Sequence, residues 1–238
     1  MDSVSTSGVQ TLDRAVAILE VVARMGPCTP ADLVRETGLP RPTVHRLAVA
    51  LEEHALVVRD RGGRFRLGGR LVGWGAAAGA GLALVEPARA VLERLSADTG
   101  ESAQLYVREG DRRVCVATHE RPTGLRDTVA LGAMMPLTKG SGGRVLLAWA
   151  TDGDRFDVDP DVLATVRAAG WAATVGEREP GVASVSAPVR VGGEVVAAIG
   201  VSGPAERLGP DPGSRFAGPV VAAAADLARA RVAPVTPL

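Results

Sequence analysis

The sequence feature that most constrains the fold is a pair of short predicted helices joined by a tight turn at Gly38. Thr29, Pro30 and Asp32 place a capping hydroxyl, a proline and an acid where a helix begins, and Gly38 ends that helix. After a three-residue connection, Pro42 starts a second helix. The apolar face of this second helix carries Val44, Leu47, Ala48 and Leu51. Such a pair is typical of a helix-turn-helix unit, whose second helix fits the major groove of DNA.

A basic hairpin is predicted directly after the second helix. Two β-prone runs, 56–59 and 64–67, are joined by the turn-forming residues 60–63. The whole chain has 27 basic and 27 acidic residues, yet residues 41–70 contain seven Arg and only three acids, a local net charge of +4. Because the excess is confined to one segment, it indicates a local anion-binding surface and not a general polyanion binder.

We therefore predict a DNA-binding surface made of the polar face of the second helix and the hairpin. Residues at the start of such a helix reach base edges, and hairpin arginines contact phosphates or the minor groove. The predicted residues are Arg41, Pro42, Thr43, His45, Arg46, Arg61, Arg64 and Arg66. A helix pair with a merely solvated polar face is the alternative. A metal-ligand role for His45 is disfavoured, because His54 and His119 are the only other histidines.

The rest of the chain alternates β-prone and helical segments, which predicts an α+β domain with helices on the faces of a sheet. The β-prone runs are 103–108, 113–119, 184–191 and 195–202, and helices begin near Ser141, Pro160 and Arg215. The Gly- and Ala-rich segment 71–84 precedes a helix from Pro87 to Asp98. We predict a DNA-binding domain at 8–72, linking helices at 73–98 and a second domain at 99–234.

The second domain also carries the elements of a small-molecule site. A Gly-rich loop, 140–143, leads into a helix, and the apolar Met135 lies just upstream. Strand alternation places Ser184 and Ser186 on one face. An apolar wall with a few hydroxyls and backbone donors is typical of ligand pockets. A plain turn before a helix, and small residues packed in a sheet, remain alternatives at each position.

Several function classes are disfavoured by what the sequence lacks. Cys28 and Cys115 are far apart with no CxxC, so we expect neither a disulfide framework nor a metal site, and no cofactor motif is present. No apolar run reaches membrane length and no export signal is recognisable, so we expect a cytoplasmic protein with no membrane partner. Without a GxSxG elbow, and with Glu177 and Glu179 interpreted as a solvated rim around Arg178, we expect no enzyme. A protein-interaction module built on the helix-turn-helix unit is the remaining alternative.

The sequence resembles one family over nearly its whole length. The run TGLPRPTVHRLAVALEEHALVVRDRGGRFRLGGRL is similar to the winged helix-turn-helix of the isocitrate-lyase-regulator (IclR) family of bacterial transcription factors. The likeness continues in TGES at 99–102, KGSGGRVLLAW at 139–149, GEREPGVASVSAPV at 176–189 and AAIGVSGPAERL at 197–208. The strings TGESAQLY, GLRDTV and GEREPGVASVSAPV are similar to an actinobacterial branch linked to leucine and other amino-acid metabolism.

This resemblance implies a winged helix-turn-helix joined to a GAF-like α/β-sheet effector-binding domain. It implies a dimer, or a dimer of dimers, on double-stranded operator DNA, with a small effector between the Gly-rich loop and the strand ends. The matching positions are Ser141, Gly142, Ser184, Gly200 and Ser202, with Met135 beside them. Ser184 stands where many members have Cys, and Gly200 where some have Ser. We therefore expect an amino acid or organic acid other than glyoxylate as the effector, and amino-acid metabolism as the regulated process.

Overall fold

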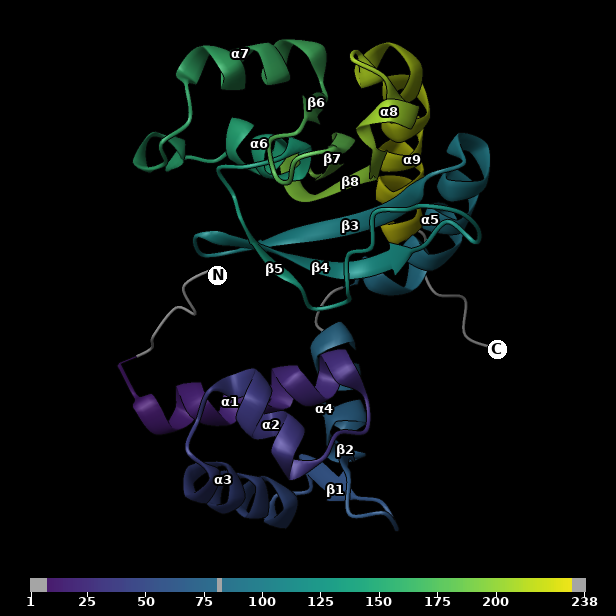
Figure 1. The fold of residues 1–238 in the computed structure, drawn as a ribbon. Coiled ribbons are helices and arrows are strands. Elements are labelled where there is room, and N and C mark those ends of the chain that lie inside the picture. The colour runs from purple at the N-terminus through teal and green to yellow at the C-terminus, as the bar shows by residue number, and fades with distance from the viewer. Residues whose placement is uncertain (1–7, 81–82, 233–238) are drawn as a thin grey trace. The chain divides into compact units, whose positions relative to one another are not determined.

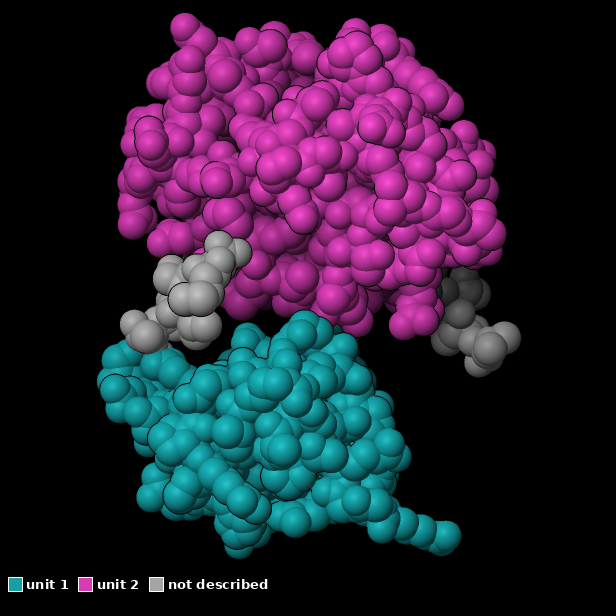
Figure 2. All heavy atoms as spheres, viewed as in Figure 1, with its two compact units in different colours: residues 1–81 teal, residues 82–238 magenta. Residues whose placement is uncertain are grey.

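The computed structural model describes residues 8–80 and 83–232, and the chain divides into two compact units, 1–81 and 82–238 (Figure 2). The elements of unit 1 are α1 (Gln10–Met25), α2 (Pro30–Thr37), α3 (Arg41–Glu53), β1 (Val57–Arg59), β2 (Phe65–Leu67) and α4 (Arg70–Ala80). Those of unit 2 are α5 (Val85–Thr99), β3 (Ser102–Glu109), β4 (Arg112–His119), β5 (Met134–Pro136), α6 (Ser141–Ala148), the 3₁₀ turn Gly153–Arg155, α7 (Pro160–Ala169), β6 (Ala172–Val175), β7 (Val182–Val191), β8 (Glu194–Pro204), α8 (Ala205–Leu208) and α9 (Pro212–Val232). Residues 233 and 234, the end of the predicted second domain, lie outside the described residues.

Unit 1 contains the predicted helix pair and hairpin, together with α1 and α4 (Figure 1). Its core joins α1, α2, α3 and the hairpin through buried residues that include Ile18, Leu33, Val44 and Phe65. Strands β1 and β2 pair antiparallel. Phe65 also exchanges two backbone hydrogen bonds with Cys28, at 3.0 and 2.8 Å, so the hairpin is fixed to the connection between α1 and α2.

The start of α2 is capped as the sequence predicts. The Thr29 hydroxyl accepts from the Asp32 backbone N–H at 3.2 Å, and the Asp32 carboxylate accepts from the Thr29 N–H at 2.9 Å. Gly38 ends α2 with φ of 66°, in the left-handed region that favours glycine. Helix α3 begins one residue earlier than predicted, at Arg41, because Pro40 serves as its N-cap and Pro42 occupies the first turn.

In residues 10–26, apolar residues at three- and four-residue spacing predict a helical face of Leu12, Ala15, Val16, Leu19, Val22 and Ala23, and the buried face of α1 differs from this prediction. The residues buried against α2 and α3 are Ile18, Val21 and Val22, whereas Leu12 and Val16 of the predicted face are 55% and 40% exposed. Helix α1 has 16 residues and α2 only eight, so the core covers only the second half of α1. The first half of α1 therefore keeps an exposed apolar stripe.

Unit 2 is built on a six-stranded antiparallel sheet in the order β5-β4-β3-β8-β7-β6, so the predicted α+β class is confirmed. One face packs against α5 and α9 through a core that includes Leu105, Val185 and Ile199. The other face lies under α6 and α7 (Figure 1). The long strands β3, β4, β7 and β8 match the predicted β-prone runs, and Gly192 and Gly193 form the turn between β7 and β8. The short edge strands β5 and β6 were not predicted.

The two predicted linking helices fall in different units. Helix α4 belongs to unit 1, whereas α5 packs in the core of unit 2 through buried residues that include Ala88, Leu92 and Leu95. Among the described residues, no helix is long and apolar enough to cross a membrane.

Candidate nucleic-acid interface and ligand pocket

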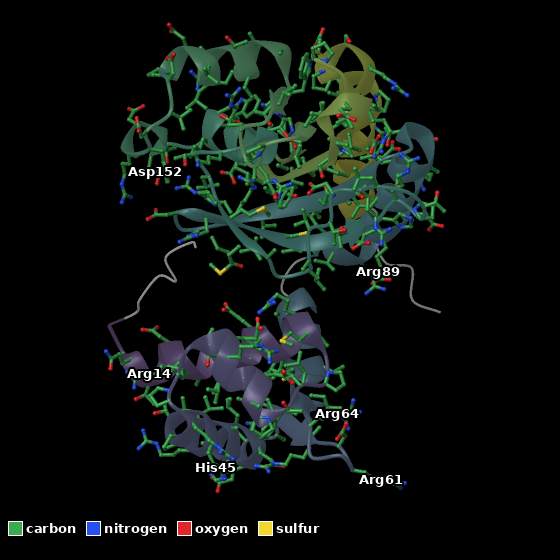
Figure 3. All side chains as sticks on the ribbon, viewed as in Figure 1. Arg14, His45, Arg61, Arg64, Arg89 and Asp152 are labelled. Atoms are coloured by element: carbon green, nitrogen blue, oxygen red, sulfur yellow. The ribbon has the colours of Figure 1, made fainter. Side chains whose placement is uncertain are left out.

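The outer face of α3 is open to solvent along its first two turns. Arg41, Pro42, His45 and Arg46 are exposed and Thr43 is half-buried, because the helix uses its opposite face for the core. Figure 3 shows His45 on the outer side of this helix. The residues predicted to read DNA thus form one continuous polar surface at the start of α3.

The arginines of unit 1 differ in whether a carboxylate neutralises them. On α1 and α2, Arg24 lies 2.9 Å from Glu36 and Arg35 lies 2.7 Å from Asp32. The Thr29 and Arg35 hydrogen bonds lower the pKa of Asp32 to about 2, so this carboxylate stays ionised. On α3, neither Arg41 nor Arg46 forms an ion pair with any residue that the structure describes. The positive charge of α3 is therefore available to an outside anion.

The hairpin is organised by the carboxylate of Asp60. That carboxylate accepts from the backbone N–H groups of Gly62 and Arg64 at 2.9 and 3.0 Å and lies 2.9 Å from the Arg64 guanidinium. These contacts hold the pKa of Asp60 below its usual value. Arg61 projects at the tip (Figure 3), and neither it nor Arg66 is ion-paired within the described part of the chain. The hairpin thus presents two unpaired guanidiniums, those of Arg61 and Arg66, and two that are already engaged, since Arg64 binds Asp60 and Arg59 lies 3.0 Å from Glu52.

In unit 2, two rows of small polar residues cross the sheet beneath α6. In the first row, Thr118, Gln104, Gly200 and Ser186 are successive neighbours on β4, β3, β8 and β7. In the second row, Ser202, Ser184 and Thr174 are neighbours on β8, β7 and β6. These rows interrupt an otherwise apolar face, so they form a polar floor under the helix.

Helix α6 closes this floor through Ser141, the residue at its start. The Ser141 hydroxyl lies 2.8 Å from the Ser184 hydroxyl and 2.8 Å from that of Ser186. The Ser202 hydroxyl donates to the Gln104 side-chain oxygen at 3.1 Å. The enclosed cavity has a volume of about 10 Å³, which is room for about one water-sized molecule. A larger ligand therefore requires the loops above the sheet to move.

The structure brings together four of the six predicted ligand-site residues. Ser141, Gly142, Ser184 and Ser202 line the cavity, whereas Met135 and Gly200 do not. Met135 and Gly200 instead contact two lining residues, Arg113 and Ser186 respectively. A Cβ on residue 200 would lie 2.3 Å from the Ser186 hydroxyl oxygen. The glycine thus makes room for Ser186, whose hydroxyl lies 2.8 Å from that of Ser141.

Eight further residues line the cavity. Gly140 belongs to the predicted Gly-rich loop and Ser186 to the predicted strand face, whereas the other six were not predicted: Gln104, Tyr106, Arg113, Asp127, Arg178 and Val201. For Arg113 a signal was present, since strand alternation places it on the same face as the buried Cys115, where an arginine is unusual. Asp127 and Arg178 come from loops, whose approach to each other leaves no periodic pattern in the sequence.

Two ion pairs tie the segment between β6 and β7 to the rest of the pocket. Arg178 donates to Asp127 at 2.6 Å, and Glu177 accepts from Arg144 at 2.7 Å. Glu177 also accepts from the Gly140 backbone N–H at 2.8 Å. The prediction of a solvated rim is therefore wrong for Glu177, which is half-buried because it closes the start of α6, and holds only for the exposed Glu179.

Among the described residues, neither a metal-binding cluster nor a reactive thiol is found at this site. No group of three His, Cys, Asp or Glu residues in the described ranges is placed to hold a metal ion. Burial raises the pKa of the Cys115 thiol to about 12, so this group is a packing residue and not a nucleophile.

Comparison with known families gives both units the same assignment. Residues 11–61 match the IclR helix-turn-helix domain, and residues 77–157 and 160–229 match the C-terminal domain of the bacterial transcriptional regulator IclR. The chain belongs to the IclR family. This family consists of transcriptional regulators with a DNA-binding domain and an effector domain, and not of enzymes.

Individual relatives of this IclR-family regulator cover most of its length. It is 32% identical to the glycerol operon regulatory protein of Streptomyces griseus, over 85% of this chain and 88% of the relative. It is 30% identical to the HTH-type transcriptional regulator BhcR of Paracoccus denitrificans, over 93% and 87% of the two chains. An IclR homologue from Microbacterium hydrocarbonoxydans, solved with 4-hydroxybenzoate, shares the fold with a TM-score of 0.73 at 24% identity, over 92% and 99% of the chains.

Proposed function

We propose that this IclR-family protein is a ligand-responsive regulator whose affinity for operator DNA changes when a small molecule enters the cavity beneath α6. The observation that carries the proposal is that one chain has two exposed arginines on α3, Arg41 and Arg46, that form no ion pair with the described residues, and also a buried polar cavity. The proposed DNA contacts are Arg41, Pro42, Thr43, His45 and Arg46 on α3, with Arg61, Arg64 and Arg66 on the hairpin.

The proposed ligand contacts are the hydroxyls and backbone at the cavity. They are Ser141, Gly142, Ser184 and Ser202, with Met135 and Gly200 supporting the wall. For the regulated process we propose amino-acid metabolism related to leucine, on the strength of the TGESAQLY and GLRDTV strings. The effector is then an amino acid or an organic acid related to it.

We further propose that the regulator acts in the cytoplasm as a dimer or a dimer of dimers. The exposed Leu12 and Val16 lie one helical turn apart on α1, and Val72 and Trp74 are exposed on α4. Covering these apolar side chains with a second copy removes them from water. Two copies also place two α3 helices on one duplex, which raises affinity well above that of a single unit.

Operator binding and its response to ligands test this proposal. The full chain selects a duplex from genomic fragments, and fluorescence anisotropy gives its affinity with and without each compound in a panel of amino acids and keto acids. We expect at least one compound to change operator affinity by about 1 to 3 kcal/mol, the usual range of such coupling.

Filling the cavity supplies the control for this experiment. Ser202→Phe places bulk in the polar floor, so it removes the ligand response and leaves ligand-free operator affinity near that of the wild type. Thr151→Phe adds the same bulk at an exposed turn and keeps the response. A normal response in Ser202→Phe would place the effector elsewhere, and operator binding that no compound changes would indicate a ligand-independent regulator.

A further inference from the structure

Two residues that line the cavity beneath α6 come from loops that are far apart in the chain. Asp127 lies in the connection between β4 and β5, residues 120–133, and Arg178 lies between β6 and β7. The other lining residues come from β3, β4, β7 and β8 and from the start of α6. Of all the lining residues, only Arg178 and Ser184 are not buried. The cavity therefore comes nearest to solvent at these two positions.

The two loops meet in one ion pair. The Arg178 guanidinium donates to the Asp127 carboxylate at 2.6 Å, and the two side chains are 23% and 7% exposed. Burial lowers the pKa of Arg178, but the hydrogen bond and the charge of Asp127 raise that pKa above its usual value, so the pair stays ionised. Charge-assisted hydrogen bonds of this kind are shorter and stronger than neutral ones.

Arg178 projects from a segment that is fixed at both ends. The Gly176 N–H donates to the Val182 carbonyl at 2.8 Å, and the Gly181 carbonyl accepts from the Ala205 N–H at 2.7 Å. Glu177 also accepts two hydrogen bonds from the start of α6, at 2.8 and 2.7 Å. This side of the ion pair is therefore a firm support.

Residues 120–128, on the other side of the ion pair, are held by few contacts. Within the described ranges, residues 120–129 form no backbone–backbone hydrogen bond, and Leu125 is 76% exposed. The segment is attached to the rest of unit 2 by Asp127, by the Arg121 N–H, which donates to the Ser102 hydroxyl at 3.2 Å, and by the buried Val129 that follows it. A segment with so few contacts opens at a low free-energy cost.

We propose that residues 120–128 are a lid over the cavity, and that the Asp127–Arg178 ion pair is the latch that keeps the lid closed. The inference rests on the proposed function, since it describes how a ligand reaches the same site. The closed cavity, at about 10 Å³, admits about one water-sized molecule, so an effector enters only while the lid is open. The lid opens at Asp127, because Arg178 stays on its fixed segment, and it remains attached at β4 and at Val129.

Alkylation of a cysteine placed in the cavity measures this opening without any effector. Ser202 lines the cavity and is 4% exposed, so the thiol of Ser202→Cys reacts with iodoacetamide only while the lid is open. Mass spectrometry of the peptide that contains residue 202 gives the rate separately from the native cysteines. Adding Asp127→Asn removes one charged hydrogen bond of the closed state, so we expect labelling about tenfold or more faster than in Ser202→Cys alone.

The lid itself supplies the matched control. Glu120 lies 2.8 Å from Arg126 in an ion pair that is contained within the lid, and the two side chains are 37% and 39% exposed. Glu120→Gln makes the same kind of change as Asp127→Asn, but it breaks no contact between the lid and Arg178. We therefore expect Glu120→Gln to leave the labelling rate unchanged.

Two variants of Arg178 test the latch from its other side. Arg178→Gln should accelerate labelling as Asp127→Asn does, whereas Arg178→Lys keeps a charged donor and should restore most of the slow rate. Hydrogen exchange of residues 120–128, measured in chains that keep Ser202, repeats the comparison and shows whether the variants remain folded elsewhere.

Three results would overturn the proposal. The first is labelling at the parent rate in both Asp127→Asn and Arg178→Gln, and the second is equal acceleration by Glu120→Gln. The third is faster labelling in Glu177→Gln but not in Asp127→Asn, because the opening would then lie at the start of α6.

Operator affinity, measured with and without the panel of amino acids and keto acids, distinguishes the two proposals. Faster labelling in the latch variants, with no compound changing operator affinity, supports the lid and counts against the ligand-responsive function. A compound that changes operator affinity, with latch variants that label at the parent rate, supports the function and overturns the lid.

Discussion

The arginines of the two candidate sites, the α3 and hairpin surface of unit 1 and the cavity of unit 2, differ in exposure and in partners. Nearly all of the basic charge of the chain is arginine, because Lys139 is the only lysine among the 27 basic residues. On α3 and the hairpin of unit 1, Arg41, Arg46 and Arg61 are exposed and form no ion pair with the described residues. At the pocket of unit 2, Arg113 and Arg178 are held by carbonyls, a carboxylate and close packing. The same side chain therefore makes a surface open to a polyanion in one unit and a fixed wall in the other.

The difference follows from desolvation. An exposed guanidinium keeps its hydration water until a phosphate replaces it. Its attraction to phosphates is therefore long-ranged and sensitive to salt, and it does not depend on one exact alignment with the DNA. A buried guanidinium has already lost that water, so its position and its partners decide which ligand fits. Exposed and buried arginines should accordingly respond to different measurements.

The largest expected effect is the loss of α3 arginines on specific DNA binding. Arg46→Ala should weaken operator binding by about 1 to 3 kcal/mol and relax specificity at one base pair if Arg46 reads a base edge. Arg35→Ala on α2 is the control, since Asp32 already neutralises Arg35. Gel-shift titrations with single-base operator variants measure both. Unchanged affinity in both Arg41→Ala and Arg46→Ala would remove α3 from the interface.

A methyl group in the pocket floor should have the next largest effect, this time on stability. In Gly200→Ala the new Cβ meets the Ser186 hydroxyl at 2.3 Å and the Val185 carbonyl at 2.4 Å. Overpacking of this kind costs about 1 to 3 kcal/mol in the free energy of unfolding. Gly218→Ala on α9, with nothing within 4 Å, should be neutral or stabilising. Denaturant unfolding measures the free energy of unfolding of Gly200→Ala and Gly218→Ala. Equal values would show that the polar floor beneath α6 is loosely packed.

The hairpin arginines should change the salt dependence of DNA binding. Each phosphate contact that is lost lowers the slope of log affinity against log salt by about 0.9. Arg61→Ala and Arg66→Ala should each show this change, and Arg64→Ala a smaller one, because Asp60 already binds the Arg64 guanidinium. Anisotropy titrations at several salt concentrations give the slopes. A slope unaffected by the Arg61→Ala, Arg66→Ala double variant would mean that the hairpin points away from DNA.

The smallest expected effect concerns the capping box that holds α2. Thr29→Ala should cost about 1 kcal/mol of stability. The pKa of Asp32 lies at about 2 in the folded chain, below its ordinary value of 3.8. Ionised Asp32 therefore stabilises the fold above pH 3.8, and this contribution is lost as the pH falls to about 2. Since Thr29 is the largest cause of the shift, the variant should lose less stability over that range. Thermal unfolding, followed by circular dichroism from acidic to neutral pH, measures the stability of both proteins and its pH dependence. Equal losses of stability in the wild type and in Thr29→Ala as the pH falls would contradict this role of Thr29.

Local signals in the sequence predict most of unit 1 and the central strands of unit 2. Caps, turns and helical spacing lie within a few residues of one another, so Thr29, Gly38 and the turn at 60–63 can be recognised without the fold. The prediction failed for the exposed Leu12 and Val16, because the length of α1 that α2 and α3 cover is a tertiary property. The short strands β5 and β6 are too brief for alternation to identify them.

The sequence predicts only those residues of the cavity that are serines or glycines within recognisable sequence motifs. Ser141, Gly142, Ser184 and Ser202 were found in this way. The charged residues of the cavity were missed because they depend on long-range contacts. Arg178 meets Asp127 across 51 positions of the chain, and no local pattern records that pairing.

The division of roles between the exposed arginines of unit 1 and the buried cavity of unit 2 is tested most directly by one crossed measurement. Ligand-free operator affinity, and the rise in melting temperature caused by a compound that changes operator affinity, are measured for the Arg41→Ala, Arg46→Ala double variant and for Ser202→Phe. We expect the double variant to lose operator affinity and keep the ligand-induced rise, and Ser202→Phe to keep operator affinity and lose the rise. Loss of both properties in both variants, or loss of operator affinity in Ser202→Phe alone, would contradict the division.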